Sequence, residues 1–243
     1  SAAKKQFLGI GDPALRGRAG TRRGIPLNKM FTPKGTAKVD IVRQQPPLPE
    51  TAEELAALAN SLGGRGNTLL LRDQATESRV RNTALTDYRV IAFATHGLIA
   101  GEIKGTAEPS LILTPPAKAS GEEDGMLTAS EIARLRLDAD LVILSACNTA
   151  APDGTPGAEG LSGLAKAFLY AGSRSLLVSH WPVDSEATVQ LTTRMLAENE
   201  RNPQLGYAKA LRQSILALME DKQSPHFAHP YFWAPFVVVG QGG

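Results

Sequence analysis

The chain has 243 residues, of which 42% are hydrophobic, with 26 basic side chains, 24 acidic side chains and a single cysteine. This length and hydrophobic content suffice for one large domain with a substantial core, and a single cysteine excludes an internal disulfide, which fits a reducing compartment. No stretch approaches the roughly 18 uncharged apolar residues of a membrane-spanning helix, and the N-terminal segment lacks the apolar run of a secretory signal. We therefore expect a cytoplasmic protein with no membrane contact and a single domain over residues 1–243.

The net charge of +2 is distributed unevenly along the chain. Residues 1–45 contain ten Lys/Arg and two Asp, a net charge of +8, which leaves −6 for the remainder. The segment at about 11–45 is also rich in turn residues, and it has almost none of the aromatic side chains that accompany basic residues in nucleic-acid interfaces. We interpret it as a basic, loop-rich, solvated segment, and we expect no nucleic-acid partner.

Extended and helical patterns alternate along the chain. The expected strands cover residues 7–12, 68–71, 88–95, 110–114, 141–146, 175–179 and 235–239. The expected helices cover residues 51–62, 76–85, 161–170, 185–199 and 203–219, with a further helix that begins at residue 128. Thr51-Ala-Glu-Glu has the pattern of a capping box at the start of its helix, and Thr128-Ala-Ser-Glu caps another.

This order of elements indicates an α/β fold. Apolar strands separated by helices predict a three-layer arrangement, in which a mostly parallel central sheet has helices on both faces. Functional residues in such folds gather at the carboxyl ends of the strands. His96 and Cys147 each follow the carboxyl end of an expected strand, so we expect them to lie at this edge of the sheet.

A histidine and a cysteine at this edge suggest nucleophilic catalysis. The thiolate is the attacking species, and a nearby imidazole both stabilises the thiolate and later protonates the leaving amine. A lone cysteine is more often a small buried side chain than a catalyst, so the prediction depends on the pairing with His96. The separation of His96 and Cys147 is 51 residues, close to the roughly 50 residues between the corresponding residues of caspases.

Six ordered blocks of sequence extend this similarity over most of the chain. They are FATHG (93–97), DGMLTASEI (124–132), LVILSACNTA (141–150), GLAKAFLYAG (163–172), SHWPVDSEAT (179–188) and HPYFWAPFVVVG (229–240). Together they resemble the CHAT family, caspase-like cysteine peptidases that are related to separases and often occur with tetratricopeptide repeats. The resemblance implies a caspase–haemoglobinase fold and hydrolysis of protein or peptide substrates by a His/Cys dyad, with no cofactor and no metal.

The resemblance also implies roles for individual residues. His96 is the expected base and Cys147 the nucleophile, and the backbone N–H groups of Gly97 and Cys147 are the expected oxyanion hole. In separase-like relatives, the segment after the tryptophan, here Trp181, supplies an acidic residue that binds a basic residue before the cleaved bond. Ser185 stands where this acid is expected, so Asp184 would replace it; alternatively, Asp184 or Ser185 only caps the following helix.

Other readings of the sequence remain open. A CHAT fold can be a catalytically silent interaction module, and family members are often controlled by a repeat domain or another partner. Gly154, Gly157 and Gly160 resemble a phosphate-binding loop. However, the chain contains no GxxxxGK[ST] motif, and the spacing of these glycines is not that of a GxGxxG motif, so nucleotide binding is disfavoured. His226 and His229 have no carboxylate or thiol near them in sequence, and we expect them to be packing residues rather than metal ligands. The oligomeric state is not predicted.

Overall fold

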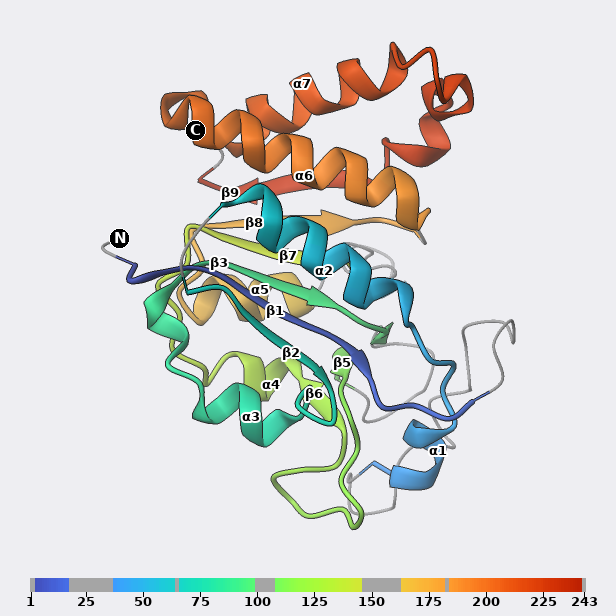
Figure 1. Cartoon of the computed structure of the whole chain (residues 1–243). Helices are drawn as coiled ribbons and strands as arrows, with labels where there is room; N and C mark the ends of the chain where they lie inside the picture. Colours follow the sequence, from blue (N-terminus) through green and yellow to red (C-terminus); the bar gives the residue numbers. More distant parts are fainter. Residues whose placement is uncertain are drawn as a thin grey trace, which may run out of the picture.

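The computed structural model describes residues 3–17, 37–63, 66–98, 108–145, 163–181 and 184–241. Within these ranges a six-stranded sheet has the strand order β2-β1-β3-β7-β8-β9 (Figure 1). Its strands are β1 (Lys5–Pro13), β2 (Thr68–Arg72), β3 (Tyr88–Ala94), β7 (Leu141–Ser145), β8 (Ser175–Ser179) and β9 (Phe236–Gly240). All neighbouring strands in it are parallel except β8 and β9, so the predicted mostly parallel central sheet is confirmed.

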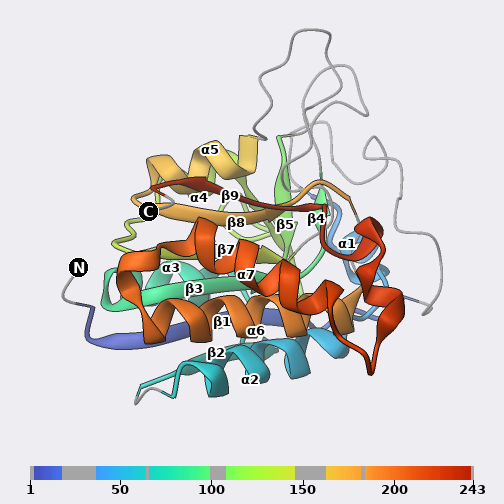
Figure 2. The ribbon, with the colours of Figure 1, turned by 90° about the horizontal axis from the view of Figure 1, so that it is seen from above.

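Helices cover both faces of this sheet, as predicted (Figures 1 and 2). One face packs against α2 (Glu50–Ser61), α6 (Ser185–Arg201) and α7 (Tyr207–Met219), and the other packs against α3 (Glu77–Asn82), α4 (Ala129–Ile132) and α5 (Gly163–Tyr170). Side chains alternate along each strand, as the two-residue period of a strand requires. In β7, Leu141 and Ile143 enter the core under α2, α6 and α7, whereas Val142 and Leu144 enter the opposite core.

A second, three-stranded antiparallel sheet holds the segment that follows β3. It consists of β4 (Gly97–Leu98), β5 (Ser110–Ile112) and β6 (Met126–Thr128) in the order β4-β5-β6. The sequence predicted β5 but neither β4 nor β6, because strands of two or three residues are too short for a periodic pattern. In the basic segment at about 11–45, β1 continues to Pro13 and residues Val39–Arg43 form the short helix α1, so its described parts are not loop throughout.

The capping box predicted at Thr51 and Glu54 is wrong. Helix α2 begins at Glu50 with Pro49 in the N-cap position, and no side chain caps it. The Thr51 hydroxyl instead donates to the Leu48 carbonyl at 2.7 Å and accepts from the Asp12 N–H at 2.9 Å, so it ties the end of β1 to α2. Glu54 is buried instead of folding back on the helix N-terminus. The second expected cap, Thr128 before α4, is confirmed as a complete capping box with Glu131.

Helix α2 lies close to the sheet because β1 has glycines beneath it. A Cβ atom at Gly11 would lie 2.6 Å from the Ala94 carbonyl oxygen and 2.7 Å from the Leu55 side chain. Real Cβ atoms do not make contacts this short, so the position requires glycine. The close approach brings the buried face of α2 onto the carboxyl end of the sheet.

The remaining elements are near their expected positions. Thr76 is the N-cap of α3, and α7 is preceded by a 3₁₀ turn at Pro203–Leu205 and by Gly206 with a φ of 73°. Further 3₁₀ turns are found at Leu85–Asp87, Pro225–Ala228 and Pro230–Phe232. In the part of the chain that the structure describes, no helix combines the length and the apolar character needed to cross a bilayer.

Candidate active site

The carboxyl ends of three adjacent strands carry the residues singled out from the sequence. Strands β3, β7 and β8 are neighbours in the sheet and run parallel. Ala94 of β3 pairs with Ser145 of β7, and His96 and Cys147 each come two residues later in the chain. Cys147 itself lies outside the described residues, and the described part of its strand ends at Ser145, which pairs with Ala94 at this edge.

The backbone of His96 is held by β5. The Ile112 N–H donates to the His96 carbonyl oxygen at 2.9 Å, and the Thr95 hydroxyl donates to the Ile112 carbonyl oxygen. The side chain of His96 is only 7% exposed. Its position at the end of β3 therefore depends on the small sheet that the sequence predicted only in part.

The Pro46 carbonyl orients the imidazole of His96. Nε2 lies 2.8 Å from this oxygen, and because a carbonyl oxygen can only accept, Nε2 carries the ring proton. In the neutral ring the lone pair is then on Nδ1, which is the nitrogen that can act as a base. Pro46 contributes a backbone atom from a position 50 residues away, and a backbone contribution leaves no side-chain signature in a sequence.

The N–H of Gly97 points away from β5. Gly97 is opposite Leu111 in the antiparallel ladder, and the hydrogen bond from Ile112 N to His96 O makes Gly97 and Leu111 a non-hydrogen-bonded pair. In such a pair the N–H groups of both residues face outward from the ladder. The orientation of this donor, one residue after His96, is compatible with its predicted use in an oxyanion hole.

Glu54 is a buried acid that the sequence analysis did not single out as a site residue. Glu54 is 3% exposed, and Ser145 at the end of β7 is its polar neighbour. Burial raises the pKa of Glu54 to about 7, the hydrogen bond from Ser145 opposes this change, and the nearby Glu50 adds to it. The local pattern Thr51-Ala-Glu-Glu suggested a helix cap, whereas the tertiary structure buries this carboxyl group.

The residues predicted to form a substrate pocket follow β8, one strand further along the same edge. Asp184 is the N-cap of α6, and its carboxylate accepts from the Ala187 N–H at 3.0 Å, so Asp184 caps this helix, and its role in a substrate pocket stays a prediction. Ser185 is the first residue of α6 and is exposed, whereas Trp181 is half-buried and donates from Nε1 to the Tyr231 carbonyl at 3.2 Å.

Of the two histidines of the C-terminal segment, His226 packs as predicted, against Phe227 and Phe232, with ring centroids 4.2 and 5.7 Å away. His229 is exposed, and its Nδ1 accepts from the Tyr231 N–H at the start of a 3₁₀ turn. No group of three potential metal ligands occurs among the described residues. Gly154, Gly157 and Gly160, on which nucleotide binding would depend, lie outside the described residues.

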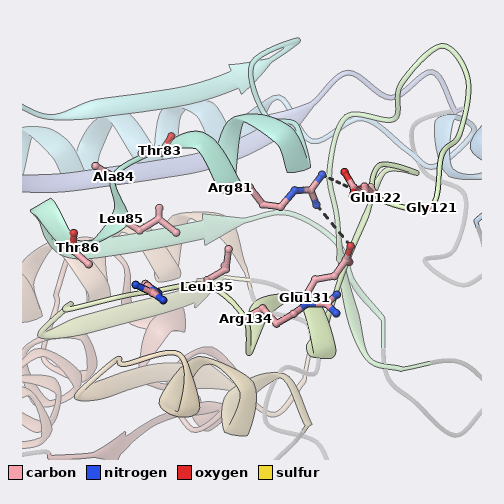
Figure 3. A pocket seen from close by; sticks show the side chains of 11 residues that line it. Arg81, Thr83, Ala84, Leu85, Thr86, Gly121, Glu122, Glu131, Arg134 and Leu135 are labelled. Carbon is pink, nitrogen blue, oxygen red and sulfur yellow. Dashed lines mark hydrogen bonds and ion pairs between the residues drawn. The ribbon is translucent and has the colours of Figure 1, made fainter.

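A hollow of about 870 Å³ lies away from His96, near the segments that precede β3 and β7 (Figure 3). Its lining includes Leu85, Thr86 and Arg134. Arg81 points toward the hollow's acidic side, where it forms an ion pair with Glu131 at 3.7 Å. This hollow is at the amino ends of the strands and does not belong to the candidate active site.

Comparison with known families identifies similar sequences. The family model described as "CHAT domain" matches residues 1–241. Tetratricopeptide repeat protein 28 of Mus musculus is 29% identical over 224 residues, which cover 80% of this chain and 9% of that protein. Its counterpart in Homo sapiens is 28% identical over 228 residues, which cover 80% of this chain and 8% of that protein. The chain therefore spans less than a tenth of the length of these relatives.

Two solved structures illustrate the similarity of the fold. The Arg-specific cysteine proteinase gingipain R has a TM-score of 0.54 at 12% identity, over 98% of this chain and 46% of that chain. A complex of the pro- and mature domains of Porphyromonas gingivalis RgpB gives a TM-score of 0.53 at 12% identity, over 98% of this chain and 47% of that chain. At this identity the likeness shows the fold alone, and the predicted caspase–haemoglobinase fold is confirmed.

Proposed function

The chain belongs to the CHAT domain family, and from this we propose that it is a cysteine endopeptidase with His96 and Cys147 as its catalytic dyad. The observation that carries the proposal is the arrangement of His96 at the carboxyl end of β3. Its Nε2–H is engaged by the Pro46 carbonyl at 2.8 Å, which leaves Nδ1 as the basic nitrogen. The neighbouring parallel strand β7 leads, in matching register, to the segment with the chain's only cysteine.

These groups supply each step of peptide hydrolysis. Nδ1 of His96 takes the thiol proton, Sγ of Cys147 attacks the peptide carbonyl carbon, and the carbonyl π electrons move to oxygen. The N–H groups of Gly97 and Cys147 stabilise this oxyanion; one such donor contributes about 2.7–4 kcal/mol to transition-state stabilisation. The oxyanion then collapses, the C–N bond breaks as the imidazolium protonates the leaving amine, and the acyl group stays on Sγ as a thioester. His96 next activates a water that hydrolyses the thioester, and the water's proton returns to sulfur.

We assign the selectivity to the segment after β8. The Asp184 carboxylate uses Oδ1 to cap α6, and its second oxygen can accept from a cationic side chain. A basic residue before the cleaved bond is therefore the preferred substrate feature, with Trp181 and Ser185 as further candidates for the pocket. Because the relatives are tetratricopeptide repeat proteins, a repeat or other regulatory domain is the proposed controlling partner.

The test is covalent labelling of Cys147 by electrophilic peptide probes, read by mass spectrometry. Three probes carry a basic, an acidic or an apolar residue before the reactive group, and Cys147→Ala and His96→Ala are the controls. We expect His96-dependent labelling with the basic probe preferred. Labelling that is unaffected by His96→Ala, or no labelling by any probe while the folded chain binds a peptide or repeat partner, would support a silent interaction module instead.

A further inference from the structure

A second hollow lies at the same edge of the sheet as His96. It has a volume of about 620 Å³, and its walls come from the segments that follow β1, β2 and β5. The described residues that line it include three arginines, Arg16, Arg43 and Arg72, and one acid, Asp73; we call it the arginine hollow. Because β1 and β2 run parallel to β3, it lies at the carboxyl ends of these strands, where ligands bind in open parallel sheets.

The strand ends beside the arginine hollow have an uncommon backbone conformation. Asp12 and Arg72, with φ values of 41° and 52°, are the non-glycine residues with positive φ in the described part of the chain. This left-handed region costs free energy in a residue with a Cβ atom, and such residues gather at functional sites. The two side chains are paired, since Nη1 of Arg72 donates to Oδ1 of Asp12 at 3.1 Å. Asp12 is buried and Arg72 is exposed, so the pair orients a guanidinium group whose other N–H groups remain accessible.

Thr114 connects these strand ends to the segment that holds His96. Its hydroxyl donates to the Arg72 carbonyl oxygen at 2.6 Å and accepts from the Ala14 N–H at 2.9 Å. Thr114 comes two residues after Ile112, whose N–H donates to the His96 carbonyl oxygen. The wall of the hollow and the proposed base are therefore held by the same short segment.

Arg16 supplies a second accessible guanidinium group. Its side chain is exposed, and none of the described carboxylates pairs with it, whereas its backbone N–H donates to the Arg43 carbonyl oxygen at 2.7 Å. The side chain of Arg43 is already engaged, by the Asp40 carboxylate and by the Pro116 carbonyl oxygen. Arg16 and Arg72 therefore remain to bind a ligand, and guanidinium groups match the two oxygens of a carboxylate.

The order of the strands indicates which part of a substrate passes the arginine hollow. The carboxyl ends of the parallel strands follow one another in the order β2, β1, β3, β7, β8. Under the proposed function, Asp184 binds the residue before the cleaved bond after β8, and His96 protonates the leaving amine after β3. A peptide that extends along this edge then has the residues after the cleaved bond over β1 and β2, where the hollow lies.

We propose that the arginine hollow is a subsite for an acidic side chain of the substrate, located after the cleaved bond, with Arg16 and Arg72 as its specificity-determining residues. This inference rests on the proposed function and extends it, because the substrate then carries a basic residue before the cleaved bond and an acidic residue after it. The carboxylate accepts charge-assisted hydrogen bonds from the two guanidinium groups. If the Asp12–Arg72 pair only tied the strand ends together, the choice of substrate would not depend on Arg16.

The test compares two quenched fluorescent peptides with the same basic residue before the cleaved bond. One has three aspartates after the bond, and the other has three asparagines, which have a similar shape and no charge. The ratio of kcat/KM for the two peptides is measured in the parent chain, in Arg16→Gln and in Arg72→Lys. Arg72→Lys keeps a cation opposite the buried Asp12 but has no fork for two oxygens. Arg212→Gln, at an exposed position of α7, is the matched control.

We expect the parent chain to prefer the aspartate peptide by about 3- to 10-fold, as for a charged pair at a partly exposed position, and to lose part of this preference in high salt. Arg16→Gln and Arg72→Lys should each bring the ratio toward equality, whereas Arg212→Gln should retain it. Equal kcat/KM for both peptides in the parent chain overturns the subsite. So does a preference that survives in both hollow variants, or one that falls equally in Arg212→Gln.

A binding measurement keeps this inference separate from the proposed function. If the parent chain cleaves neither peptide, the peptidase function fails, and the fluorescence anisotropy of the same peptides, labelled with fluorescein, then tests the hollow alone. Tighter binding of the aspartate peptide to the parent chain than to Arg16→Gln supports the acid-binding site. Equal binding of the aspartate and asparagine peptides by the parent chain overturns it.

Discussion

The hydrogen bond between His96 and the Pro46 carbonyl predicts how a substitution of the base should behave. In His96→Gln the side-chain amide can still donate to Pro46 but cannot take a proton from the thiol. We therefore expect a folded protein whose rate of Cys147 labelling by the peptide probe falls by about 10²- to 10⁴-fold, the usual contribution of a general base. His226→Gln, at a packed histidine in the C-terminal segment, is the matched control, and an equal loss in that variant would contradict the assignment.

The pKa of Glu54 predicts a pH dependence of stability. Its pKa rises from 4.5 to about 7 on folding, so between these values the folded state holds a proton that the unfolded state has released. The free energy of unfolding must therefore fall as pH rises through this range, by about 3 kcal/mol in total. Glu54→Gln lacks this group, so urea unfolding should show its stability advantage over the parent chain growing between pH 4.5 and 7. A difference that is constant with pH would exclude this titration.

At the level of the elements, the contact between β1 and α2 leaves no room for a side chain at Gly11. Gly11→Ala would place a Cβ atom 2.6 Å from a backbone oxygen of β3, and backbone cannot move aside as a flexible side chain can. We expect a loss of about 1–3 kcal/mol in the free energy of unfolding. In Gly121→Ala the new Cβ would have no neighbour within 4 Å, so this variant should resemble the parent in urea unfolding; equal losses in both would refute the steric argument.

The N-terminus of α6 offers a test of the selectivity pocket. Asn is as good an N-cap as Asp, so Asp184→Asn should keep the stability of the parent, whereas Asp184→Ala should lose about 0.5–2 kcal/mol. If Asp184 also recognises a basic substrate residue, Asp184→Asn should lose the preference for the basic probe while remaining as stable as the parent. The measurement is the ratio of labelling rates for the basic and apolar probes, and an unchanged ratio would leave Asp184 as a cap only.

The same elements explain what the sequence could and could not predict. Runs such as Leu141–Ser145 are apolar because both faces of the sheet are covered, and this local pattern is sufficient to predict the strands, the fold class and the edge at which His96 lies. The contact that orients the base joins distant positions: the Pro46 carbonyl reaches His96 across 50 residues. The role predicted for Glu54 was wrong because its local sequence fits a capping box, whereas burial in the folded chain determines the position of its side chain.

The whole molecule brings the candidate site together from segments spread along the chain, from Pro46 through His96 to Asp184. The two cores on either side of the sheet share its strands, so neither can unfold without exposing the other. We therefore expect a single cooperative transition in urea, with far-ultraviolet circular dichroism, tryptophan fluorescence from Trp181 and Trp233, and His96-dependent labelling of Cys147 all changing together.

Both tryptophans hydrogen-bond to the C-terminal segment, so their fluorescence reports on that region, whereas dichroism reports on all helices. Loss of labelling and fluorescence at a lower urea concentration than the dichroism would instead identify the carboxyl edge as a separate, less stable unit, and a single-domain description of the chain would then be wrong.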